Sequence, residues 1–210
     1  MSENIKRIVP FDEIITALLD MNRPFPPVFL HRFSNLNPND LQKVRAVWAE
    51  VNPDRRAALT EDLENLADAD TLMMFDEIAK FALDDSDPRV RVSAIRLLIE
   101  CQDPKLAPKF LQILENDPNP AVRAAAATSL GQYIYLGEIE EISQDILHQV
   151  EEQLLDSLQS NEDKLVRRRA PRFFRPAGSQ AVDFFCLFKR RPRVVNQRRF
   201  CHGAFSRSGL

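Results

Sequence analysis

One pattern, written more than once along the chain, limits the possible folds more than any other feature. Residues 86–98 read SDPRVRVSAIRLL, and residues 119–131 read NPAVRAAAATSLG. When Asp87 is aligned with Asn119, 32 residues later, Pro, Val, Arg, Ala and Leu recur in the same columns. A third stretch, which begins at Asp163 a further 44 residues along, keeps the Val, Arg and Ala columns. The chain therefore contains a repeated structural unit.

Each column of the repeat has a physical role. Asp or Asn caps the first turn of a helix, and Pro follows at the first helical position, where a missing N–H costs nothing. Val and the Ala four residues later share one helical face, which we expect to be buried along with Leu130. The repeat positions are Asp87, Val90, Arg91, Ala94, Asn119, Val122, Arg123, Ala126, Asp163, Val166, Arg167 and Ala170.

Other segments also have apolar residues at helical spacing. The periodicity predicts helices over residues 12–20, 39–51, 53–67, 70–83, 88–101, 104–116, 119–135 and 138–159, and it predicts no strands. A single pair of such helices cannot bury its apolar faces alone, so the pairs are expected to stack. Gly131 is expected either to end its helix or to allow close packing.

The Asp/Asn-Pro-x-Val-Arg-x-x-Ala pattern resembles the HEAT repeat, in the short variety that is also named after phycobilisome lyases. The resemblance covers about residues 84–170 and implies an all-α fold, a right-handed α-solenoid of HEAT-like helical hairpins. It also implies that Arg91 and Arg123 reach acids near the turns, such as Asp85 and Asp117. Asn52-Pro53, followed by Arg56, is interpreted as a degenerate first repeat, because terminal repeats are often atypical.

The sequence divides into three predicted parts. Residues 1–38 form an N-terminal helix and a connector whose prolines prevent a continuous helix. Residues 39–170 form the solenoid. Residues 171–210 form a basic tail of low order, since Pro171 interrupts the third matched helix and seven of the 14 Phe follow it.

The charge of the chain is very unevenly distributed. Residues 164–210 hold 13 Lys and Arg against the single acid Asp183, whereas residues 1–163 hold 15 against 30. The tail could be a basic segment that binds nucleic acid or a segment that lies on a membrane surface. A third interpretation, an out-of-frame translation, is favoured, because permitted codons for residues 189–205 shifted by one base restore an Asp-Pro turn.

No pattern in the sequence indicates catalysis, a bound cofactor or a metal site. The three histidines are scattered, the three cysteines have no paired spacing, and five glycines leave little room for a phosphate-binding loop. The N-terminus lacks the apolar run of a secretory signal, and no segment is apolar enough for a membrane span. We therefore expect a cytoplasmic protein with reduced thiols.

The favoured function is that of a non-catalytic scaffold that binds another protein. Its partner-binding residues are expected among the solvent-facing arginines Arg89, Arg96 and Arg123. One alternative, implied by the resemblance, is a bilin-lyase-like or lyase-accessory protein. Another is nucleic-acid binding through the tail, which the strongly acidic remainder of the chain disfavours.

Overall fold

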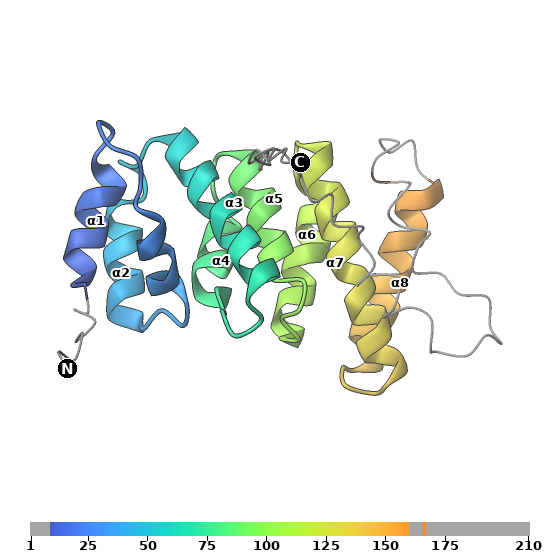
Figure 1. Ribbon diagram of the computed structural model, residues 1–210. Coiled ribbons are helices and arrows are strands. Elements are labelled where there is room, and N and C mark those ends of the chain that lie inside the picture. Colours follow the sequence, from blue (N-terminus) through green and yellow to red (C-terminus); the bar gives the residue numbers. More distant parts are fainter. Residues whose placement is uncertain (1–8, 160–165, 167–210) are drawn as a thin grey trace, which may run out of the picture. The chain divides into compact units, whose positions relative to one another are not determined.

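The computed structural model describes residues 9–159 and residue 166 (Figure 1). Within this part of the chain all regular secondary structure is helical, which confirms the predicted all-α fold. The elements are α1 (Phe11–Leu19), η1 (Pro27–Phe33), α2 (Pro38–Val47), α3 (Pro53–Ala69), α4 (Asp76–Ala82), α5 (Pro88–Leu97), η2 (Pro104–Leu106), α6 (Ala107–Asn116), α7 (Pro120–Glu138) and α8 (Gln144–Gln159), where η marks a 3-10 helix. The repeat positions Asp163, Arg167 and Ala170 and the predicted tail 171–210 lie outside the described residues.

The helices pack in two layers. One layer consists of α3, α5 and α7, in which α5 contacts both of the others. The other layer consists of α2, α4, α6 and α8, in which α2 contacts α4 and α6 contacts α8. The layers are joined where α4 packs on α5 and α6 on α7 (Figure 1). The repeating unit is thus a helix from one layer followed by a helix from the other, as the sequence predicts.

The helices of the first layer begin in the same way. Asn52, Asp87 and Asn119 each accept a hydrogen bond at Oδ1 from the backbone N–H two residues later, at 2.8 Å, and a proline follows each of them. This side-chain bond satisfies one of the N–H groups that a helix leaves unpaired in its first turn. The shared cap also supports Asn52-Pro53 as the start of a degenerate repeat.

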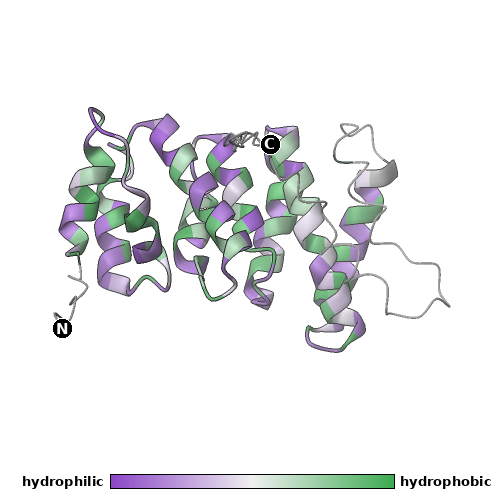
Figure 2. Cartoon of the chain, viewed as in Figure 1, coloured by the Kyte–Doolittle hydropathy of each residue, from purple (hydrophilic) through white to green (hydrophobic). Residues whose placement is uncertain are grey.

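The repeat columns form the core between the layers. Val90, Ala94, Val122, Ala126 and Leu130 are all fully buried, as the pattern predicts. Val166, from the third copy, is fully buried as well. Most helices have one hydrophobic side and one hydrophilic side (Figure 2). The exception is α7, which is buried on several sides because it contacts α5, α6 and α8.

An ion pair links one repeat to the next. Arg91 on α5 donates from Nε to Asp117 Oδ2 at 2.8 Å and from Nη2 to Asp117 Oδ1 at 2.9 Å. Its Nη1 donates to the carbonyl oxygen of Asp85 at 2.8 Å, and the Nη1 of Arg123 donates in the same way to the carbonyl oxygen of Asp117. The arginine column therefore points toward the turns, which the resemblance implied.

The degenerate first repeat has its own version of this link. Arg56 occupies the same column as Arg91, and its Nη1 lies 3.4 Å from Asp85 Oδ2. The same carboxylate oxygen accepts a hydrogen bond from Trp48 Nε1 at 2.6 Å. The Nε of Arg56 is buried without a hydrogen-bond partner among the described residues, so this pair is less complete than its counterpart. We call the pairs Arg56–Asp85 and Arg91–Asp117 the ladder.

Two predicted helices begin later than the periodicity indicates. The helix predicted over 70–83 begins at Asp76, because Met74 is held by the preceding connector: its N–H donates to Ser34 Oγ, and its carbonyl accepts from the Asn35 N–H. The helix predicted over 138–159 begins at Gln144, because α7 continues to Glu138 and a turn follows. In that turn Glu140 has a φ of 63°, which ends the helical run.

The structure adds a helix to the predicted connector and decides between the two roles predicted for Gly131. The Pro-rich connector contains η1, which contacts α3 and continues the first layer beyond it. Gly131 is buried within α7, so it does not end a helix. At Gly137 on the same helix an added Cβ would lie 2.6 Å from a side-chain atom of Leu147, which shows how closely α7 and α8 approach each other.

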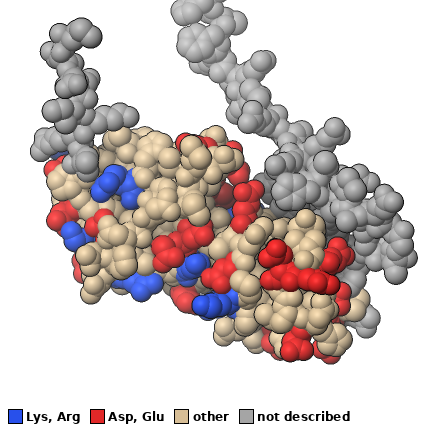
Figure 3. Space-filling view, turned by 90° about the horizontal axis from the view of Figure 1, so that it is seen from below, with Lys and Arg blue, Asp and Glu red and all other residues tan. Residues whose placement is uncertain are grey.

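The described surface is rich in acids. Figure 3 shows more Asp and Glu than Lys and Arg on one face of the molecule. Residues 124–159 contain seven acids and neither Lys nor Arg. Four of these acids lie exposed at the turn between α7 and α8, at Glu138, Glu140, Glu141 and Asp145. The described part of the chain therefore carries the acidic character that the sequence assigns to it.

Candidate partner-binding groove

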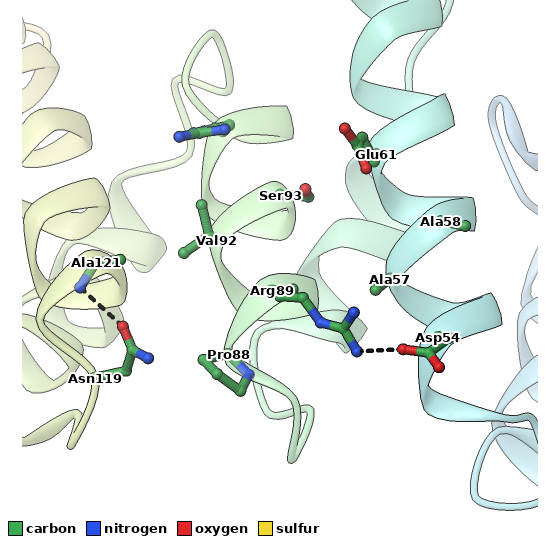
Figure 4. A pocket seen from close by; sticks show the side chains of 11 residues that line it. Asp54, Ala57, Ala58, Glu61, Pro88, Arg89, Val92, Ser93, Asn119 and Ala121 are labelled. Carbon is green, nitrogen blue, oxygen red and sulfur yellow. Dashed lines mark hydrogen bonds and ion pairs between the residues drawn. The ribbon is translucent and has the colours of Figure 1, made fainter.

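A groove of about 460 Å³ runs across the layer formed by α3, α5 and α7 (Figure 4). This volume lies within the usual range for ligand sites, about 300–1,000 Å³. Three successive repeats contribute to its walls. The lining residues are Asp54, Ala57, Ala58, Glu61, Pro88, Arg89, Val92, Ser93, Arg96, Asn119 and Ala121.

The common start of the three helices places equivalent residues side by side. Two residues after the cap stand Asp54 on α3, Arg89 on α5 and Ala121 on α7, and all three line the groove. The order across the groove is therefore acid, base, neutral. One turn further along, the small residues Ala57 and Ala58 give the groove a shallow apolar floor.

Arg89 bridges the α3 and α5 sides of the groove. Its Nη2 lies 2.8 Å from Asp54 Oδ1 and 2.7 Å from Asp87 Oδ2, and the first of these contacts is drawn in Figure 4. Its Nε lies 3.2 Å from both carboxylate oxygens of Asp87. The hydrogen bonds with these acids raise the pKa of Arg89 and, in return, lower the pKa of Asp87. The pair is therefore charged at neutral pH, although the arginine side chain remains 59% exposed.

Arg96 lies two helical turns further along α5 and is held more loosely. Its Nη1 lies 3.4 Å from Glu64 Oε1, at the edge of hydrogen-bonding distance. Its side chain is 48% exposed. Most of the five N–H donors of this guanidinium therefore face solvent in the groove.

The structure brings two of the three predicted partner-binding arginines together and places the third elsewhere. Arg89 and Arg96 both line the groove, whereas Arg123 does not. Arg123 is half-buried, and its Nη1 donates to the carbonyl oxygen of Asp117 at 2.8 Å. A role of Arg123 in partner binding stays a prediction; the residue stands in the same column as Arg91 and takes the same direction.

Sequence reasoning missed the residues of α3 and α7 that line the groove. Asp54, Glu61 and Ala121 become neighbours of the arginines only after the caps are aligned across three helices. Asn52-Pro53 is the sequence signal from which Asp54 and Glu61 could have been predicted, since it sets the register of α3 against α5.

The other polar clusters are structural. Lys80 lies 3.6 Å from Asp103 Oδ2, and Tyr133 donates its hydroxyl to the Asp103 carbonyl at 2.9 Å. Burial raises the pKa of Tyr133 and that of the Cys101 thiol, so both groups stay protonated at neutral pH. In the part of the chain that the structure covers, no group of three or more His, Cys, Asp or Glu side chains is placed to hold a metal ion.

Stacked helical pairs whose second helices share one register and one face define an α-solenoid, a class of helical-repeat protein. A family model described as HEAT repeats matches residues 75–172. The match includes α4 to α8, so this part of the chain consists of HEAT repeats. Neither a curated protein nor a solved structure matches the chain. Among the described helices, none combines the length and the apolar character that crossing a membrane requires.

Proposed function

We propose that the protein is a non-catalytic scaffold that binds a segment of another protein in the groove over α3, α5 and α7. The observation that carries the proposal is that three successive repeats contribute to one groove. Solenoids offer extended surfaces of this kind, built from equivalent positions of stacked repeats. Asp54 and Arg89 pair with each other across the groove, and Arg96 contacts Glu64, which suits recognition rather than proton transfer.

The composition of the groove supports a peptide-like occupant. Ala57, Ala58 and Ala121 leave space for a backbone to approach closely, and two half-exposed arginines supply hydrogen-bond donors. Arginine is one of the residues enriched where proteins contact each other. Nucleic acid is a poor fit, because the described acids would repel phosphates and the groove itself holds acids as well as bases.

The test uses the full chain and a random peptide library displayed on phage. Peptides selected on the wild type should bind Ala58→Trp and Ala121→Trp at least ten times more weakly, since each tryptophan fills the groove from an exposed position. Ala46→Trp, at an exposed position on α2, is the matched control and should bind as the wild type does. Equal binding to all variants, or the absence of any selected peptide, would overturn the proposal.

A further inference from the structure

The charged residues that line the groove lie on α3 and α5. The acids are Asp54 and Glu61 on α3, and the bases are Arg89 and Arg96 on α5. Arg89 and Asp54 form an ion pair at 2.8 Å, and the formal charges of the four residues cancel. The groove therefore has no excess of positive or negative charge that would select a strongly charged occupant.

The side of the groove between α5 and α7 is different. Among the described residues, those that line it are Pro88 and Val92 on α5 and Asn119 and Ala121 on α7, and none of them is charged. Val92 projects from α5 toward α7 (Figure 4). Because the other three side chains are apolar, the carboxamide of Asn119 is the side-chain group with which an occupant of this side can form hydrogen bonds.

The cap of α7 decides which end of the Asn119 carboxamide an occupant meets. Its Oδ1 accepts the N–H of Ala121 at 2.8 Å, so the oxygen is committed to the helix. The amide nitrogen, which carries two N–H donors, points toward Pro88 on α5 (Figure 4). No residue that the structure describes accepts a hydrogen bond from this nitrogen, and it is not buried. Both donors are therefore open to an occupant of the groove.

The equivalent residues of the two preceding helices offer no such donors to the groove. Asp87 has a carboxylate without any N–H, and it is engaged by Arg89. Asn52 makes the same cap bond as Asn119, with the N–H of Asp54 at 2.8 Å, but it does not line the groove. Of the three caps described for this layer, Asn119 alone therefore brings amide donors to the groove.

We infer that Asn119 recognises the bound segment by donating a hydrogen bond to one of its main-chain carbonyl groups, within an uncharged stretch. Its small neighbour Ala121 leaves room for a main chain to come this close. Apolar side chains beside that carbonyl would pack on Val92 and Pro88. The inference rests on the proposed function, since it names the group that the same groove recognises in its occupant.

Asn119→Asp tests the two amide donors while the cap is kept. Aspartate caps a helix as well as asparagine does, and Asp87 already occupies this column in the preceding repeat. Peptides selected on the full chain should bind this variant at least ten times more weakly, because their carbonyl loses its donor and faces a carboxylate. Asn119→Ser, which removes the amide without adding a charge, should also weaken binding.

Asn52→Asp is the matched control. It is the same substitution at the equivalent cap, it adds the same charge, and it lies outside the lining of the groove, so binding should stay unchanged. Thermal melts of Asn52→Asp and Asn119→Asp should match that of the wild type, because both helices keep their caps. The loss of affinity in Asn119→Asp then reports on the groove and not on folding.

The carbonyl itself can be located in one selected peptide by replacing its peptide bonds, one at a time, with thioamides, whose sulfur is a weak hydrogen-bond acceptor. One replacement should weaken binding to the wild type severalfold and have little effect on binding to Asn119→Asp. The two changes remove the same hydrogen bond, so their effects should not add.

The outcomes separate this inference from the proposed function. Peptides that Ala121→Trp blocks but Asn119→Asp does not weaken would overturn the inference and leave the groove as the binding site. Tighter binding to Asn119→Asp would overturn it as well, because it would indicate a cationic occupant, and so would a thioamide series without a position coupled to Asn119. Peptides that tolerate both Ala58→Trp and Ala121→Trp would overturn the proposed function itself.

Discussion

Arg91 on α5 and Asp117, in the turn before α7, form a two-bond ion pair that is almost fully shielded from water. Their side chains are only 11% and 7% exposed, and the two hydrogen bonds measure 2.8 and 2.9 Å. Asp117 also accepts the N–H of Asn119 at Oδ1, which shapes the turn. One carboxylate therefore fixes both the entry to α7 and the contact of α7 with the previous repeat.

Asp117→Asn should destabilise the protein by about 3 kcal/mol, because it leaves the Arg91 charge buried without its partner. The amide oxygen can still accept the Asn119 N–H, so the loss reports mainly on the charge. Chemical unfolding of the two proteins measures the difference. The exposed pair Lys43–Asp12 is the control, and Asp12→Asn should cost less than about 1 kcal/mol. Equal losses at the two sites would contradict the structural role of the ladder.

Val122→Asp should destabilise by several kcal/mol, because Val122 is fully buried and the substitution places an unpaired charge in the core. Thermal melts give the comparison. Ala121→Asp, one residue earlier at an exposed position in the first turn of α7, should be nearly neutral. A Val122→Asp protein that melts like the wild type would show that the assigned core face is wrong.

Gly137→Ala should destabilise by about 1 kcal/mol, although alanine is the better helix former. The new Cβ would lie 2.6 to 2.9 Å from three side-chain atoms of Leu147, so the Leu147 side chain or α8 has to shift. In a Leu147→Ala background the obstacle is gone, and Gly137→Ala should then be neutral or stabilising. The change of sign between the two backgrounds, measured by urea unfolding, is the critical result.

Acid should remove the contribution of Asp87 to stability. Its hydrogen bond with Arg89 lowers the folded-state pKa of Asp87 below the ordinary value of 3.8, so this contribution is complete above 3.8 and is lost as the pH falls through the lower folded value. Asp87→Asn keeps the cap but cannot titrate. Its deficit in unfolding free energy relative to the wild type should therefore be largest at neutral pH and shrink toward pH 3. Arg89→Gln should reduce that pH dependence, and a constant deficit would contradict the assignment.

The fold was predictable from the sequence because the repeat columns have local causes. Asp87 and Asn119 are caps wherever such helices begin, and Val90 and Val122 mark the buried face by spacing alone. The starts of α4 and α8 were not predictable, since the first depends on hydrogen bonds between Met74 and a connector about 40 residues away. The direction of Arg123 toward the turn was predictable from its column, because Arg91 occupies the same position in the preceding repeat.

The groove was only partly predictable. The sequence predicts Arg89 and Arg96 as exposed arginines, seven residues apart on one helix. Their neighbours Asp54 and Ala121 depend on how α3 and α7 are aligned against α5, and that alignment comes from packing between repeats. The alignment of α3 was hard to predict, because the first repeat keeps only the Asn52-Pro53 start and Arg56 and lacks the Val and Ala columns of the later repeats.

The ladder gives the repeats that it joins a polarity. A unit presents an arginine to the unit that follows it and an aspartate to the unit before it, as Arg56 meets Asp85 and Arg91 meets Asp117. A tandem duplication of one whole unit would therefore meet compatible ends on both sides. Such an array can grow or shrink in multiples of its unit without a new kind of junction, whereas an insertion of half a unit would separate an arginine from its aspartate.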